Sequence, residues 1–144
     1  MAYASQTDLT NVGMPALALG TLTTQQINAA LDNASTYADG FFRARWGTNA
    51  VPLVAWDSAV TEAVAKIAAY RLMAIRGYNP EAGRDSQFRQ GYDDAVDWLN
   101  KVQRQQAHPL VTLAAGATAR QEPNLTSSSI VDLSTGASAP TRGW

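Results

Sequence analysis

Residues 23–47 of the chain read TTQQINAALDNASTYADGFFRARWG, and this stretch carries the clearest structural signal in the sequence. Thr23 and Gln26 have the spacing of a capping box, in which each side chain bonds the other residue's backbone N–H at the start of a helix. Apolar residues then recur every three or four positions up to Trp46, and Gly47 is a typical helix stop. The stretch therefore predicts a helix about 36 Å long at 1.5 Å per residue.

Gly40 lies inside this predicted helix, where glycine costs about 1 kcal/mol relative to alanine. One interpretation is that a neighbouring backbone approaches closely at Gly40 or that the helix kinks there. The other is that the strain is simply tolerated, and the sequence favours neither.

Two further helices are predicted downstream. The first is capped by Asp57 or Ser58 and ends at Gly77. Its inward face is expected to hold Val60, Val64, Ile67, Ala68 and Ile75, together with either Leu72 or the stem of Arg71. The second runs over about residues 85–106 and stops at His108-Pro109, with an inward stripe of Phe88, Tyr92, Val96, Leu99 and Val102. With a short capped turn over residues 7–12, the pattern predicts an all-α fold, a small bundle of three main helices plus a short N-terminal helix.

The chain after residue 107 has a different character. Its only charged side chains are Arg120, Glu122, Asp132 and Arg142, and apolar residues are scattered among Ser, Thr, Ala and Gly at Leu110, Val111, Leu113, Leu125, Ile130, Val131, Leu133 and Trp144. Such a segment is too apolar for a solvated tail and too irregular to fold alone. We therefore divide the chain into a helical domain, residues 1–107, and an extended C-terminal arm, residues 108–144, which is ordered on assembly and whose apolar residues are interface candidates.

Residues 127–134 of the arm form a short extended pattern around Ile130, Val131 and Leu133. An isolated strand of this kind is not stable in water, so pairing with the edge of another chain is one solution. Simple disorder is the alternative.

Composition narrows the possible functions. Eleven basic residues nearly balance twelve acidic ones, which argues against a DNA-coating protein or a peripheral membrane binder. The absence of cysteine excludes disulfides and thiolate metal sites, and no stretch is apolar enough to span a membrane. His108, the single histidine, suits a protonated cap on the negative end of a helix dipole better than a catalytic role. We expect no enzyme activity, cofactor or metal, and we expect a protein that is cytosolic where it is made.

Two groups of charged residues are further candidates. Arg43, Arg45 and Trp46 end the first long helix, and because arginine and tryptophan concentrate binding energy in protein interfaces, this group is a candidate interface. Asp93, Asp94 and Asp97 share one helix face, which is typical of a solvated surface rather than of a magnesium site. If these carboxylates have a function, we expect electrostatic complementarity to a partner or mild repulsion of DNA.

From residue 7 to about residue 111 the chain resembles the head-tail adaptor proteins of tailed bacteriophages, also called connector or head-completion proteins, in particular the small helical family of Mu-like phages. The resemblance is carried by the order and spacing of Thr7-Asp8-Leu9, Ala30-Leu31-Asp32-Asn33-Ala34-Ser35, Ala38-Asp39-Gly40-Phe41, Pro52-Leu53, Ile67-Ala68-Ala69-Tyr70-Arg71-Leu72 and Gly91-Tyr92-Asp93-Asp94-Ala95-Val96-Asp97-Trp98-Leu99. The connection over residues 19–23 is shorter than in many relatives, and the core resemblance does not cover the long arm.

The resemblance implies a structural virion protein of the phage neck, assembled in the host cytoplasm. It implies a homo-oligomeric ring, a dodecamer, that sits beneath the portal protein, extends the DNA channel and offers a surface to a tail-side stopper or tail terminator protein. Genomic DNA would only pass through the lumen, and no membrane is involved. The alternative is a small helical DNA-binding or regulatory protein, which the acidic side chains of Asp93, Asp94 and Asp97 disfavour because phosphates would face them.

Overall fold

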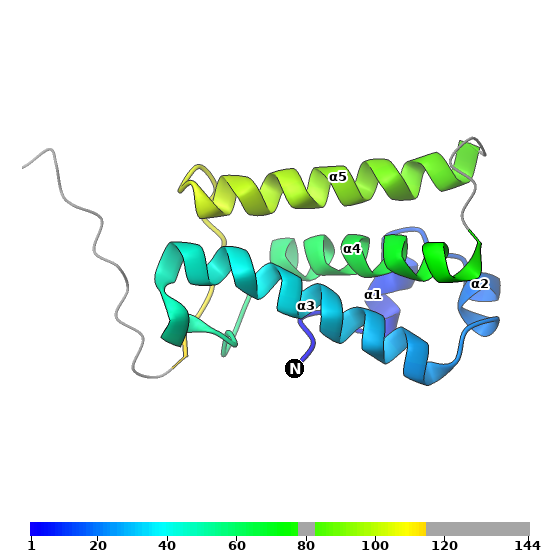
Figure 1. Cartoon of the computed structure of the whole chain (residues 1–144), viewed down its shortest axis with the longest axis horizontal. Coiled ribbons are helices and arrows are strands. Elements are labelled where there is room, and N and C mark those ends of the chain that lie inside the picture. Colours follow the sequence, from blue (N-terminus) through cyan, green and yellow to red (C-terminus); the bar gives the residue numbers. More distant parts are fainter. Residues whose placement is uncertain (78–82, 115–144) are drawn as a thin grey trace, which may run out of the picture.

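The structure, a computed structural model, describes residues 1–77 and 83–114, and this part of the chain is built from helices (Figure 1). In chain order they are α1 (Gln6–Asn11), α2 (Ala16–Gly20), α3 (Thr24–Trp46), the 3-10 turn η1 (Thr48–Ala50), α4 (Ser58–Arg76) and α5 (Gly83–Gln103). The predicted all-α bundle of three long helices and a short N-terminal helix is confirmed. The short helix α2 was not predicted, and no helix within the described ranges is long and apolar enough to cross a membrane.

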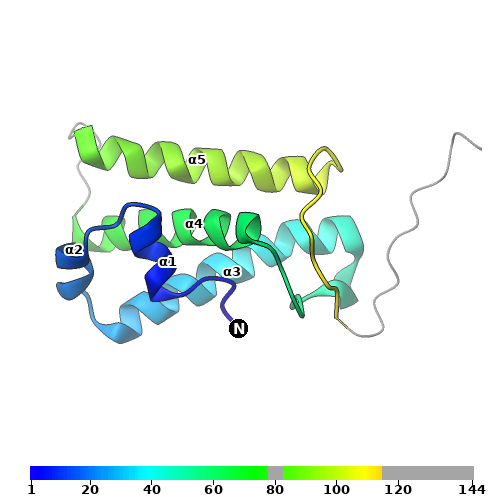
Figure 2. The same ribbon diagram turned by 180° about the vertical axis from the view of Figure 1, so that it is seen from behind.

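Helix α4 lies at the centre of the bundle and packs against α3, α5 and α1 (Figures 1 and 2). The helices α3 and α5 run in the same direction, and α4 runs against both. Burial extends around most of α4, which therefore carries small and branched apolar residues on several faces: Val60, Ala63, Val64, Ala65, Ile67, Ala68, Ala69, Leu72 and Met73. The prediction for Ile75 is wrong, because residues 74–76 end the helix beyond its packed part and leave Ile75 56% exposed.

The start and end of α3 are those predicted. The Gln26 backbone N–H donates to Thr23 Oγ1 over 3.1 Å, and the Thr23 N–H donates to Gln26 Oε1 over 2.9 Å. Gly47, with φ +95°, follows the last turn and donates its N–H to the Arg43 carbonyl. At Gly40, a Cβ would meet no atom within 4 Å and the helix continues unbroken. Of the two interpretations of Gly40, the described structure therefore favours tolerated strain over a close approach or a kink.

Helix α5 ends earlier than predicted, at Gln103 rather than near residue 106. Gln105 adopts the left-handed conformation with φ +63°, and the Gln106 N–H reaches back to the Lys101 carbonyl while the Gln105 N–H reaches the Val102 carbonyl. This is the Schellman arrangement, in which a left-handed residue usually filled by glycine reverses the chain. A glutamine at this place gives no stop signal in the sequence, so the prediction that the helix continues to His108-Pro109 is wrong.

Candidate interaction surfaces

The N-terminal segment is anchored by Tyr3, which is 1% exposed. Its backbone N–H donates to Ser35 Oγ on α3 over 2.9 Å. Its carbonyl oxygen accepts from Trp56 Nε1 over 3.0 Å and from Thr61 Oγ1 on α4 over 3.1 Å. One residue near the terminus therefore joins two long helices and the segment between them.

The Tyr3 hydroxyl extends this connection in two directions. It donates to the Asp39 carboxylate on α3 and accepts from the Leu53 backbone N–H over 3.0 Å. Burial, followed by the hydrogen bond to Asp39, raises the pKa of the Tyr3 hydroxyl. Burial also raises the pKa of the Asp39 carboxyl, and the Tyr3 hydrogen bond and the nearby Arg43 guanidinium partly offset that effect. Sequence analysis missed this site because a single tyrosine outside any helix carries no periodic signal.

Arg45 joins the C-terminal ends of α3 and α5. Its side chain is 8% exposed, and Nη1 donates to the carbonyl oxygens of Val102 over 2.8 Å and Ala107 over 2.6 Å. Its Nη2 lies 2.8 Å from His108 Nδ1, which must be the acceptor because a guanidinium can only donate. The cation that meets the carbonyl end of α5 is thus Arg45, and His108 lies beside the guanidinium rather than on the carbonyl oxygens themselves.

The three residues of the predicted interface at the end of α3 differ in their surroundings. Arg45 is committed to contacts inside its own chain. Trp46 is half-buried, packs on Phe42 with ring centroids 5.7 Å apart, and lies under the Arg45 guanidinium. Arg43 is exposed. A role in an interface stays a prediction for Arg43 and Trp46.

Asp93, Asp94 and Asp97 are all exposed on α5. Asp97 pairs with Lys101 over 2.8 Å, and Asp93 lies 4.0 Å from Arg89, so two of the three carboxylates have a cation one turn away. Within the described ranges, no group of three or more His, Cys, Asp or Glu residues is placed to hold a metal ion. The three aspartates therefore form a charged, solvated face.

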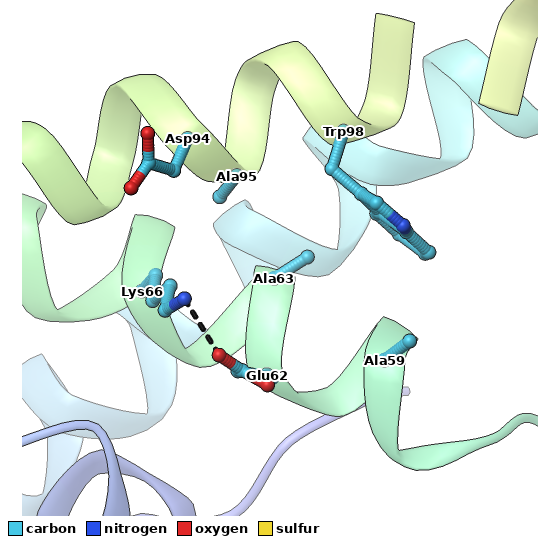
Figure 3. A pocket seen from close by; sticks show the side chains of 7 residues that line it. All are labelled: Ala59, Glu62, Ala63, Lys66, Asp94, Ala95 and Trp98. Atoms are coloured by element: carbon cyan, nitrogen blue, oxygen red, sulfur yellow. Dashed lines mark ion pairs between the residues drawn. The ribbon is translucent and has the colours of Figure 1, made fainter. Parts of the chain in front are cut away.

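A hollow of about 160 Å³ lies between α4 and α5 beside Asp94 (Figure 3). Small side chains line it, with Trp98 to one side and the ion pair between Glu62 and Lys66, 2.6 Å long, to the other. Sites for small ligands usually enclose about 300–1,000 Å³ and hold convergent polar groups. This hollow is smaller than that and open to solvent, so it does not have the form of a small-ligand site.

The first residues of the predicted arm pack on the body. The Thr112 N–H donates to the Ala55 carbonyl and the Val54 N–H donates to the Thr112 carbonyl, each over 2.8 Å. The Ala114 N–H bonds the Ala50 carbonyl over 3.1 Å, and the Leu110 N–H bonds Asp57 Oδ2 over 2.9 Å. We call residues 110–114 the ladder segment.

Ordering of the arm on assembly is thus not needed for residues 108–114, which already bond to the body in the single chain. Side chains of the ladder segment alternate in burial: Val111 and Leu113 pack against the core, whereas Leu110 and Thr112 are exposed. Leu110 is 80% exposed and Val54, on the paired segment, is 60% exposed. The remaining interface candidates lie outside the described residues: Leu125, Ile130, Val131, Leu133 and Trp144.

The comparisons with known proteins identify the family. A search of curated proteins gave no match. Residues 3–129, which include the whole helical body and part of the arm, match the family model described as bacteriophage Mu, Gp36. The chain therefore belongs to the bacteriophage Mu Gp36 family and is a phage protein.

Proposed function

We propose that this phage protein is a structural component of the virion neck, where identical copies form a ring below the portal, join head to tail and extend the DNA channel. The observation that carries the proposal is the exposed apolar surface of the segment that precedes the arm's last 30 residues. The ladder segment is bonded to the helical body, and the side chains of Leu110 and, on the paired segment, Val54 are exposed beside it. In the sequence, 30 further residues with few charges (115–144) follow. Exposed apolar residues beside a long segment with few charges favour assembly with other polypeptides.

The partners follow from this role. The subunit binds further copies of itself in a ring, for which the family resemblance suggests a dodecamer, and it binds the portal protein on one side and a tail-side stopper or tail terminator protein on the other. Such a ring is a closed heterologous assembly, in which two different surfaces of one subunit meet. DNA passes through the lumen, and catalysis is not part of the proposal.

The charge distribution supports a channel protein over the alternative, a small DNA-binding or regulatory protein. Helix α5 would have to enter a groove of DNA, yet it exposes Asp93, Asp94 and Asp97. Carboxylates facing phosphates oppose binding, whereas DNA-binding proteins rely on Lys and Arg contacts to the backbone. Near balance of eleven basic and twelve acidic residues suits a surface past which DNA must slide.

Light scattering of the full-length protein, alone and mixed with the portal protein of the same phage, tests the proposal. We expect a complex of portal with many copies of this chain. Leu110→Ser is expected to weaken that complex, because it removes an apolar side chain that is 80% exposed on the ladder segment. Leu17→Ser is the matched control, since Leu17 is 87% exposed on α2, far along the chain from the ladder segment. A protein that ignores the portal and binds duplex DNA tightly would support the alternative.

A further inference from the structure

Among the residues that the structure describes, the ladder segment has one edge without hydrogen-bond partners. Hydrogen bonds to residues 50–57 use the backbone groups of Leu110, Thr112 and Ala114. Successive residues of an extended chain direct their N–H and C=O groups to opposite sides. The backbone groups of Val111 and Leu113 therefore point away from the paired segment, and within residues 1–77 and 83–114 no hydrogen bond involves them.

Such an edge is a template for an added strand. Two residues with outward N–H and C=O groups offer up to four backbone hydrogen bonds to an incoming extended chain. The flank is apolar as well, because the exposed side chain of Leu110 stands beside this edge and Val54 lies on the paired segment. Natural proteins usually protect open edges with lysine, proline or a covering loop. Pro109 lies at the start of this edge, and Val111 and Leu113, which follow it in the same register, are neither lysine nor proline.

We propose that this edge accepts residues 129–133 of a second copy of the chain as an added β-strand. The proposal rests on the ring of the proposed function, which places a second copy beside each subunit. Residues 129–133 read Ser-Ile-Val-Asp-Leu, so Val131 and Leu133 share one face while Ile130 and Asp132 share the other. The first face continues the core-facing side formed by Val111 and Leu113.

Chain length favours a second copy over the chain's own arm. Residues 115–128 would have to form the connection if the arm folded back on its own ladder segment. Connections between adjacent strands usually have about 2–5 residues. A connection over residues 115–128 would have 14 residues, which is within the range of about 12–15 beyond which loops without structure of their own are uncommon. The 30 residues after Ala114, by contrast, reach about 100 Å when extended, which is well beyond the length of one subunit's helices.

The absence of cysteine allows a direct test by disulfide cross-linking. In an antiparallel pair, the residue opposite Thr112 on the added strand would occupy a non-hydrogen-bonded position with Cα atoms about 4.5 Å apart, which suits a disulfide. Thr112→Cys chains are mixed with differently tagged chains that carry one cysteine at position 130, 131, 132 or 133. The mixture is assembled with the portal protein, oxidised, and separated without reductant.

We expect heterodimers at arm positions 130 and 132, because the residue opposite Thr112 shares its solvent-facing side and only alternate residues of a strand face the same side. Cross-linking at 131 and 133 alone would overturn the proposed pairing, because it would turn Val131 and Leu133 away from the core. Ala44→Cys, exposed on α3, replaces Thr112→Cys as the control and should give none. Cross-linking at all four positions, or at none, would overturn the proposal. If a chain carrying both cysteines of a productive pair forms the bond only within itself, the second copy is excluded.

A backbone substitution gives independent evidence. Leu113→Pro removes one outward N–H and should abolish the cross-link, whereas the inner bonds of Thr112 and Ala114 remain. Leu113→Ala keeps the N–H, although it removes more side-chain atoms than Leu113→Pro does. If the backbone N–H is what matters, the Leu113→Ala chain should still cross-link. Equal loss in both variants would show that side-chain packing, not strand addition, is responsible. If the chains bind the portal but do not cross-link, the added strand is refuted and the neck function is not. If they cross-link but do not bind the portal, the neck function is refuted and the added strand is not.

Discussion

Tyr3 shows how much of this fold depends on a single side chain. Its hydroxyl satisfies the backbone N–H of Leu53 and bonds the Asp39 carboxylate, while its backbone holds Ser35, Trp56 and Thr61. Polar groups that are buried without a partner cost about 1–3 kcal/mol each, so the value of this site lies in having every group satisfied.

Tyr3→Phe is therefore expected to lower the free energy of unfolding by about 2–3 kcal/mol, because it leaves the Leu53 N–H and the Asp39 carboxylate without that partner. Urea unfolding followed by circular dichroism measures the change. Asp39→Asn is the comparison, since its amide oxygen still accepts from the Tyr3 hydroxyl, and it should cost less than Tyr3→Phe. A Tyr3→Phe protein as stable as the parent would show that the contacts contribute nothing net.

The raised pKa of Tyr3 predicts a pH dependence. An unfolded tyrosine loses its proton near pH 10.0, whereas the folded chain keeps the Tyr3 proton to higher pH. The native state then binds more protons than the unfolded state, so stability falls as the pH rises above about 10. Stability measured between about pH 8 and about pH 11 should decline less steeply in Tyr3→Phe than in the parent, and parallel curves would contradict the assignment. Burial also raises the pKa of Tyr92, but Tyr92 is present in both proteins and contributes equally to the pH dependence of their stability.

At the scale of single elements, the helix ends combine local signals with tertiary contacts. The capping box at Thr23 and the glycine at position 47 are local, and α3 begins and ends at the expected places. Helix α5 ends through a left-handed glutamine instead, while Arg45 bonds the carbonyls of Val102 and Ala107 from another helix. A contact between distant residues thus supports a helix end that has no glycine.

Gln105→Gly should stabilise the protein by about 1 kcal/mol, because a left-handed conformation strains any residue with a Cβ atom and glycine adopts it freely. The thermal midpoint reports the gain. Gly47→Ala provides the reverse case, since it places a Cβ at φ +95° and should destabilise the end of α3. A loss of stability in Gln105→Gly would mean that the side chain of Gln105 contributes more than the strain costs.

Gly40→Ala should also stabilise the free chain by about 1 kcal/mol, because Gly40 lies in the middle of α3 with open space around its Cα. The same measurement tests it. Gly91 on α5 is a useful companion, since a Cβ there would touch only the Lys66 side chain at 3.8 Å and should be tolerated. If Gly40→Ala stabilises the free chain but impairs its assembly, Gly40 lies at a contact between subunits.

At the scale of the whole molecule, surface charge and the arm concern assembly rather than folding. The carboxylates of Asp93, Asp94 and Asp97 are exposed, and exposed ion pairs such as Asp97–Lys101 contribute little to stability. Their effect is expected in the encounter with charged partners, where the field of a surface acts over about 10 Å and is screened by salt.

Replacing all three aspartates with asparagine should leave the folded body nearly as stable as before and change how assembly with the portal depends on salt. Sedimentation of the mixture at low and high salt measures this. Unchanged assembly at both salt concentrations would remove any electrostatic role from this face.

The sequence alone was enough to predict the three long helices, the cap of α3 and the central position of apolar residues on α4, because these depend on hydrogen bonds and periodicity within a few residues. The early end of α5, the Tyr3 site and the docking of the ladder segment depend on partners 32–63 positions away along the chain. A segment of five residues or a lone tyrosine has no local preference for such partners. Only the packing of α3, α4 and α5 brings them within bonding distance, so the edge at Val111 and Leu113 became visible in three dimensions alone.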